Sequence, residues 1–169
     1  MLSRTAPWNV AAKEVMNPDV ITVRDDMTVQ EVAAFLTENQ ISGAPVEDGE
    51  GRLVGVVSST DIARAASDPN ALELPALEPE FFTRGWEEAP LSIEDLRGMH
   101  PTVPSLIVAE IMTPRLHSIG EDATVAEAAR MMLDAHIHRL LVTSGHKAVG
   151  ILTTFDLLRL LVGDGTASP

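Results

Sequence analysis

The sequence predicts a mixed α/β (α+β) protein made of two β-α-β-β-α repeats, because the chain aligns with itself. A shift of 96 residues aligns EVMNPDVITV (14–23) with EIMTPRLHSI (110–119), and a shift of 95 aligns LVGVVSSTDI (53–62) with AVGILTTFDL (148–157). The aligned segments keep the same order and spacing. A single copy of about 50 residues is marginal for a stable core, so we expect the copies to pack face to face with pseudo-twofold symmetry.

Each copy carries the same series of local signals. A short apolar run after a proline predicts the first strand, and a Thr-x-x-Glu capping box then predicts the start of an amphipathic helix. Two short strands joined by a turn-prone loop follow, and a last helix closes the copy. The expected elements are helical turns at 13–16 and 108–112, first strands at 20–23 and 116–119, helices capped by Thr28/Glu31 and Thr124/Glu127, paired strands at 44–47 with 53–58 and at 140–143 with 148–153, and closing helices from Ser59 and Thr154.

These signals divide the chain into five parts. We predict a tail at 1–11, a first repeat at 12–66, a connector at 67–107, a second repeat at 108–162 and a tail at 163–169.

The connector is rich in Pro, Glu and Leu. Its aromatic residues Phe81, Phe82 and Trp86 predict a packed helical turn, and Ser92 with Asp95 can cap another short helix. We favour a partly ordered strap over the core, and a lid or partner-docking element is the alternative.

Composition restricts the classes of function. The chain has 169 residues, of which 45% are apolar and 22% are charged, as in ordinary soluble globular proteins. The net charge of −13 argues against nucleic acid or an anionic membrane as the main partner. The absence of cysteine excludes disulfides, thiolate catalysis and cysteine-based zinc sites. No signal peptide or apolar segment of membrane length is visible, so we expect a cytoplasmic protein.

A ten-residue motif recurs where each copy passes from its last strand to its closing helix, as GVVSSTDIAR and as GILTTFDLLR. Ser58 with Asp61, and Thr153 with Asp156, can form capping boxes, which account for the hydroxyl and the acid. The motif also suits a nucleotide, since helix N–H groups can bind phosphate and a carboxylate can accept hydrogen bonds from two ribose hydroxyls. The glycine that opens each motif lies within an apolar strand and indicates a bulge or a close backbone approach. The two interpretations are compatible.

These residues resemble tandem cystathionine-β-synthase (CBS) domains, a pair also called a Bateman module. The resemblance rests on VMNPDVITV, ISGAPVED and GVVSSTDI in the first copy, and on IMTPRLHSI, IHRLLVT and GILTTFDLLRL in the second. It covers both repeats and leaves the connector and the tails outside. It implies a regulatory module that senses adenine nucleotides or related adenosyl ligands.

The resemblance also implies which residues contact the ligand. The matching Asp holds the ribose, the hydroxyl residue lies near the phosphate, and the adenine lies among apolar side chains with backbone contacts from the first strand. The implied nucleotide-binding residues are Val20, Ile21, Thr22, Gly43, Ala44, Pro45, Ser58 and Asp61 in the first copy, and Leu116, His117, Ser118, His138, Arg139, Leu140, Thr153 and Asp156 in the second.

The copies differ at one place that bears on the ligand. The second has His-Arg at 138–139 where the first has Ser-Gly at 42–43. Arginine suits bidentate phosphate binding, so we expect the second site to favour a phosphorylated ligand and the first to be weaker or more nucleoside-like. An ion pair between Arg139 and nearby acids explains the arginine nearly as well.

We predict a non-catalytic sensor rather than an enzyme, because no motif brings a nucleophile and a base together. Its ligand is AMP, ADP or ATP, with S-adenosylmethionine or NAD(H) as alternatives, held between the repeats. No cofactor is required, and His136 and His138 are treated as ordinary histidines because a metal site needs three or four ligands. The expected partners are a second copy of the chain and a separate regulated protein, with no nucleic acid and no membrane. The alternative is a ligand-free interaction and dimerisation module.

Overall fold

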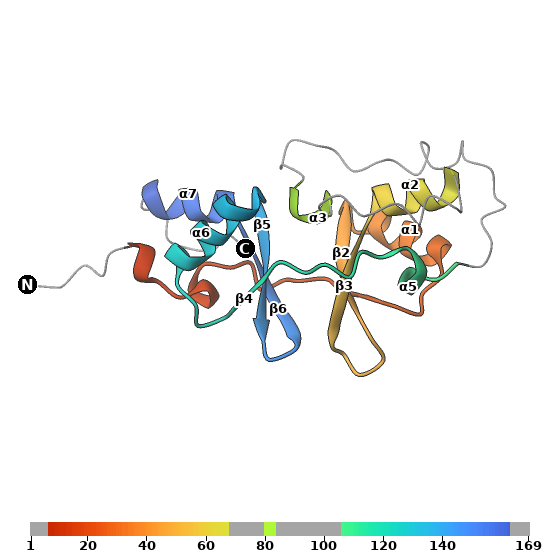
Figure 1. Ribbon diagram of the computed structural model, residues 1–169, viewed down its shortest axis with the longest axis horizontal. Helices are drawn as coiled ribbons and strands as arrows, with labels where there is room; N and C mark the ends of the chain where they lie inside the picture. Colours follow the sequence, from red (N-terminus) through yellow and green to blue (C-terminus); the bar gives the residue numbers. More distant parts are fainter. Residues whose placement is uncertain (1–6, 68–79, 84–105, 163–169) are drawn as a thin grey trace, which may run out of the picture. The chain divides into compact units, whose positions relative to one another are not determined.

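Residues 7–67, 80–83 and 106–162 are described by the computed structural model of the chain. They form helices and strands in the order that the repeats predict (Figure 1). Two separate three-stranded sheets are present, each with its own helices. The predicted mixed α/β class is therefore confirmed.

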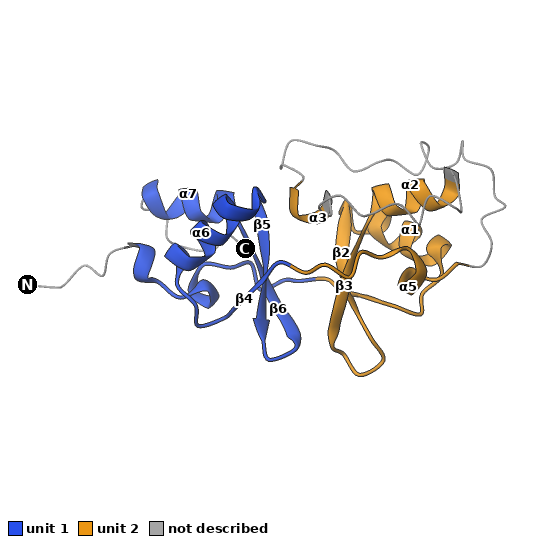
Figure 2. Ribbon diagram, viewed as in Figure 1, with its two compact units in different colours: residues 1–20, 117–169 blue, residues 21–116 orange. Residues whose placement is uncertain are grey.

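The chain folds into two compact units (Figure 2). We call residues 21–116 the first unit, because they contain the first sheet; they are orange and labelled unit 2 in Figure 2. Residues 1–20 and 117–169, blue and labelled unit 1 there, are the second unit. The elements of the first unit are β1 (Val23–Arg24), α1 (Val29–Glu38), β2 (Gly43–Glu47), β3 (Leu53–Ser58), α2 (Ser59–Ser67), α3 (Glu80–Thr83) and α5 (Val108–Ile111). The elements of the second are the 3-10 helices η1 (Pro7–Asn9) and η2 (Ala12–Glu14), then β4 (Ser118–Gly120), α6 (Val125–Ala135), β5 (Arg139–Ser144), β6 (Lys147–Thr153) and α7 (Thr154–Val162).

The two sheets have the same topology. The strand order is β1-β2-β3 in one and β4-β5-β6 in the other, with a parallel pair followed by an antiparallel pair. A register irregularity falls at the matching place in each antiparallel pair, just after Val46 pairs with Gly55 and just after Val142 pairs with Gly150. The alignment of the sequence with itself therefore corresponds to a structural alignment.

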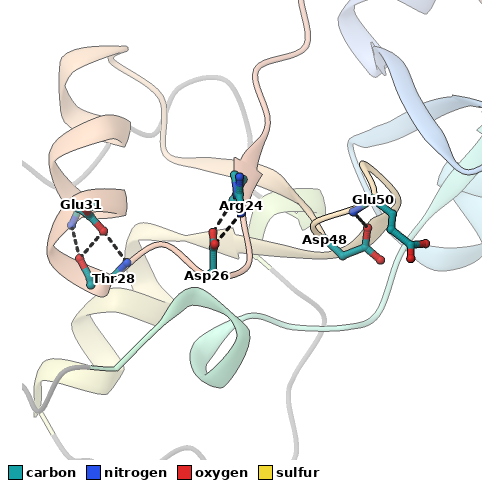
Figure 3. Close-up of polar contacts among 6 residues, drawn as sticks. All are labelled: Arg24, Asp26, Thr28, Glu31, Asp48 and Glu50. Atoms are coloured by element: carbon teal, nitrogen blue, oxygen red, sulfur yellow. Dashed lines mark hydrogen bonds and ion pairs between the residues drawn. The ribbon is translucent and has the colours of Figure 1, made fainter.

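Capping boxes set the starts of α1 and α6, as the sequence predicts. The Thr28 hydroxyl accepts a hydrogen bond from the backbone N–H of Glu31 at 3.2 Å, and the Glu31 carboxylate accepts one from the N–H of Thr28 at 2.8 Å (Figure 3). Thr124 and Glu127 repeat this exchange at 3.2 and 2.7 Å. These bonds satisfy N–H groups that a helix start leaves without partners.

The first strands begin later than the sequence predicts, at Val23 and at Ser118. In the second unit the Leu141 N–H donates to the carbonyl of His117 at 3.0 Å, which extends the pairing of β4. Pro45 occupies the matching place in β2 and has no N–H to donate. The pairing of β1 therefore starts one residue later along the repeat.

Each unit is completed by the segment that opens the other repeat. In the second unit, the Ala12 N–H donates to the carbonyl of Ala123 at 2.7 Å, and Asn17 forms a two-bond bridge with Ile151. In the first unit, α5 and its flanking residues do the same, with Val56 and Thr113 forming the bridge. The short helical turns predicted at the head of each repeat exist, but they pack in the unit formed by the other repeat.

Apolar side chains between each sheet and its helices form the cores. In the first unit the core includes Val29, Val32 and Leu36 of α1 and Ile62 and Ala65 of α2. In the second unit α6 contributes Val125, Ala128 and Met132, whereas α7 contributes no buried residue. Among the described residues, no helix is both long and apolar enough to cross a membrane.

Candidate functional site

The passage from β3 to α2 is a tightly bonded strand-to-helix junction. One oxygen of Asp61, Oδ2, accepts hydrogen bonds from the backbone N–H of Ser58 at 2.8 Å and from its hydroxyl at 2.6 Å. The N–H of Asp61 donates back to the Ser58 hydroxyl at 3.3 Å. Ser58 and Asp61 are only 4% and 7% exposed, and Oδ1 of Asp61 lies 3.5 Å from Arg64. Both carboxylate oxygens therefore face groups of the protein.

The passage from β6 to α7 repeats these bonds at the same distances. Oδ2 of Asp156 accepts from the Thr153 N–H at 2.8 Å and from its hydroxyl at 2.6 Å, and the Asp156 N–H donates to that hydroxyl at 3.3 Å. Both residues are half-buried. Within the described part of the chain, Oδ1 of Asp156 has no hydrogen-bond or ion-pair partner. This junction leaves a carboxylate oxygen available to a ligand, whereas at the first junction the matching oxygen lies 3.5 Å from Arg64.

The leading N–H groups of both closing helices are largely used by the protein. The N–H of Ser59 donates to the carbonyl of Ser42 at 2.9 Å, and the N–H of Thr154 donates to that of His138 at 2.9 Å. The N–H of each capping aspartate is also engaged. A phosphate at these junctions must therefore be bound mainly by side-chain cations rather than by the helix start.

The register places a different residue beside each capping hydroxyl. Gly43 pairs with Ser58 in the first unit, and Arg139 pairs with Thr153 in the second. Arg139 is half-buried and His138 is exposed. His138 lines an open pocket of about 590 Å³ between α6 and α7, together with His136, Thr154 and apolar residues. Arg139, Thr153 and Asp156 do not line that pocket, although the carbonyl of His138 accepts the N–H of Thr154 at the start of α7.

The remaining predicted contacts lie in the segments around the first strands or in the buried core. The first-strand residues Val20, Ile21 and Thr22 precede β1, and Leu116 and His117 precede Ser118 at the start of β4. The side chains of Ala44, Pro45 and Leu140 are fully buried, so a ligand can reach these three residues only through their backbone.

The glycine that opens each motif has a structural explanation. A Cβ at Gly55 would lie 2.8 Å from the carbonyl oxygen of Thr113 and 2.9 Å from the Met112 sulfur. At Gly150 it would overlap the Met16 side chain and lie 3.0 Å from the carbonyl oxygen of Asn17. The close approach that the sequence indicates is made by the segment that opens the other repeat. No ligand is needed to explain either glycine.

The structure also shows a neighbour of the site that the sequence does not locate. Phe81 of α3 lies against Gly43, within 3.2 Å of the position that a Cβ on that glycine would take. The aromatic pair predicts a packed helical turn, which α3 confirms, whereas Trp86, Ser92 and Asp95 lie outside the described residues. No local signal indicates that this turn packs at the first junction.

The described residues of the two units contain no group of side chains that could hold a metal ion. No three His, Asp or Glu side chains there lie close enough to share an ion. His136 has a left-handed backbone (φ 53°) at the C-cap of α6, and Gln40 has φ 54° at the matching place after α1. The left-handed residue that follows the helix is thus a feature of both repeats, and the backbone of His136 has a structural role.

Comparison with known proteins identifies the repeats. The family model of the CBS domain matches residues 12–68 and 108–163. An uncharacterized protein of Methanocaldococcus jannaschii is 29% identical over 166 residues, covering 89% of this chain and 90% of that protein. The chain spans between 23% and 65% of the length of six further curated relatives.

Solved CBS domain pairs share this fold. The CBS domain pair of protein MJ0100, in complex with 5′-methylthioadenosine and S-adenosyl-L-methionine, is 24% identical with a TM-score of 0.60, over 92% of this chain and 98% of that chain. CBSX2 from Arabidopsis thaliana, in complex with AMP, is 23% identical with a TM-score of 0.61, over the same shares of the two chains. The two family matches together cover more than half of the sequence, and the chain belongs to the CBS domain family.

Proposed function

We propose that this CBS pair is a non-catalytic regulatory module that binds an adenosyl ligand of the AMP, ADP or ATP class and signals to a separate protein. The observation that carries the proposal is the β6–α7 junction, where the cap of α7 uses one oxygen of Asp156 and leaves the other available. The AMP complex of CBSX2 and the S-adenosylmethionine complex of MJ0100 support an adenosyl ligand.

The roles follow from the chemistry of each group. Oδ1 of Asp156 accepts hydrogen bonds from ribose hydroxyls, and the Arg139 guanidinium binds the phosphate. The backbone of Leu116, His117 and Ser118 contacts the adenine. S-adenosylmethionine and NAD(H) remain alternative ligands, because they share the adenosyl group that these contacts would bind.

Calorimetric titration with AMP, ADP, ATP, S-adenosylmethionine and NADH tests the proposal. Asp156→Asn keeps an oxygen for the cap but removes the free carboxylate oxygen. Loss of one charge-assisted hydrogen bond, about 1.5–3 kcal/mol, weakens binding by about 10- to 150-fold. Thr124→Ala is the matched control, since it removes the cap of α6 in the same unit and should leave affinity unchanged. The proposal fails if the wild type binds none of the five compounds, or if Asp156→Asn binds as well as the wild type.

A second candidate, a ligand-free dimerisation module, is favoured by the surface of α7. Leu158, Leu161 and Val162 are 56%, 73% and 77% exposed. With Trp8 and residues of α6, Leu158 and Leu161 line a shallow groove that is largely apolar. Exposed apolar surface of this kind marks interaction sites. We propose a second copy of the chain as its partner, and this candidate needs no ligand at Asp156.

A further inference from the structure

Phe81 occupies the space beside the strand-to-helix junction of the first unit. Gly43 opens β2 and pairs with Ser58, whose hydroxyl belongs to the Asp61 cap. A Cβ on Gly43 would lie 3.2 Å from Cδ2 of Phe81 and 3.2 Å from Cα of Ser58. The phenyl ring therefore reaches the position where the first repeat is expected to contact its ligand.

The ring is a packed part of this unit. Phe81 is 3% exposed and Phe82 is 0% exposed. Their rings meet edge to face, with centroids 5.0 Å apart and planes at 89°. The short helix α3 that carries them packs against β3. A ring buried to this extent has no open face on which an adenine could stack, so it fills the space rather than lining it.

Gly43 is suited to this contact because it has no side chain. A Cβ there would also lie 2.7 Å from the carbonyl oxygen of Val57, so any larger residue would have to displace backbone as well as the phenyl ring. The matching residue of the second unit is Arg139, which pairs with Thr153. At the second strand-to-helix junction this position is therefore an arginine of β5. At the first junction it is a glycine, and the Phe81 ring of α3 packs against it.

We infer that Phe81 closes the adenosyl site of the first repeat, so that the chain binds one ligand, at the Asp156 junction. Phe81 blocks the first repeat by occupying the space beside Gly43. The burial of Asp61 and the contact between its Oδ1 and Arg64 agree with a closed junction. The inference rests on the proposed function, because it assumes that the ligand is adenosyl and that each repeat offers a comparable site.

The test is calorimetric titration with AMP of the full chain, the Phe81→Ala variant and the Phe81→Ala/Asp61→Asn double variant. We expect one site in the wild type, a second site in Phe81→Ala, and loss of that second site in the double variant, where asparagine retains a cap oxygen. Phe82→Ala is the matched control, since it removes an equally buried ring but keeps Phe81, the ring that lies 3.2 Å from the Cβ position of Gly43, and it should keep a single site. Melting curves establish which variants are folded at the assay temperature.

A measurement on the wild type keeps the inference testable if Phe81→Ala does not fold. On addition of AMP, the backbone amide signals of Arg139, Thr153 and Asp156 should shift in the nuclear magnetic resonance spectrum, whereas those of Gly43 and Ser58 should not. Two sites in the wild type, shifts at Gly43 and Ser58, or a single site in folded Phe81→Ala would each overturn this inference and leave the proposed function intact. No binding by either protein would overturn both.

Discussion

Replacing Gly55 by alanine tests the assembly of the first unit most directly. The new methyl group would lie 2.8 Å from the carbonyl oxygen of Thr113 and 2.9 Å from the Met112 sulfur. The sulfur belongs to a flexible side chain that can move aside. The carbonyl cannot move alone, because it accepts the Val56 N–H at 2.9 Å and the Thr113 N–H donates to Val56 at the same distance.

The cost follows from these contacts. Overpacking of a filled interior costs about 1–3 kcal/mol. Loss of the two hydrogen bonds of the bridge adds about 1 kcal/mol each where they break. Alanine also lowers the conformational entropy of the unfolded chain, which offsets about 0.4–1 kcal/mol of this loss of stability. The net loss is about 2–5 kcal/mol, which lowers the melting temperature by about 4–20 °C in a chain of this length.

Thermal melts followed by circular dichroism measure this effect, and two other glycines serve as comparisons. A Cβ at Gly120 would meet no atom within 4 Å, so Gly120→Ala should melt within about 2 °C of the wild type, since surface changes stay within about 0.5 kcal/mol. Gly150→Ala should cost less than Gly55→Ala, since its nearest neighbour is the movable Met16 side chain and the Asn17 carbonyl is 3.0 Å away. If Gly55→Ala melts with the wild type, the close approach of Thr113 does not explain the glycine.

Two further predictions concern pH and assembly. Hydrogen bonds from the backbone and hydroxyl of Thr124 lower the pKa of Glu127 from its ordinary 4.5, so its stabilising effect is complete above that value and is lost as the pH falls below it. Glu127→Gln should therefore melt below the wild type at pH 7 by a margin that narrows below pH 4.5, and a constant margin would contradict the capping role. Leu158→Glu should convert a dimer into a monomer in light scattering, because it places a charge on the exposed apolar surface of α7. Gln30→Glu, on an exposed site of α1, should not, and a monomeric wild type would exclude the proposed dimer.

Local signals in the sequence predicted most of the fold. Helix starts were predicted well because a capping box is complete within four residues, as Thr28 with Glu31 shows. The paired strands were predicted to within a residue, since the turn-prone loop that joins each pair is also a local signal. The starts of the first strands were predicted less accurately, because they depend on whether the neighbouring strand has a backbone N–H to donate. Pro45 and Leu141 differ in that property, and the comparison requires the register to be known.

Contacts between distant segments were not predictable in the same way. Gly55 and Gly150 indicated that backbone approaches closely, but a glycine does not specify which segment approaches it. The approaching residues, Thr113 and Asn17, belong to the segment that opens the opposite repeat. The packing of Phe81 at Gly43 is equally non-local: the aromatic pair predicted burial, and the residue that it would cover could not be read from either position alone.

Two copies of one fold have thus acquired different chemistry at matching junctions. Both keep the capping aspartate, because Asp61 and Asp156 each hold the start of a closing helix whether or not a ligand binds. The similarity of the two motifs is therefore not evidence for two ligand-binding sites, since the helix cap alone requires the hydroxyl and the acid. What separates the copies is the residue beside the cap: Arg139 adds a cation to the second junction, and Gly43 leaves room for an aromatic ring at the first. Among the described residues, the second junction combines a carboxylate oxygen that the cap does not use with an arginine on the adjoining strand, whereas at the first junction the matching oxygen of Asp61 contacts Arg64.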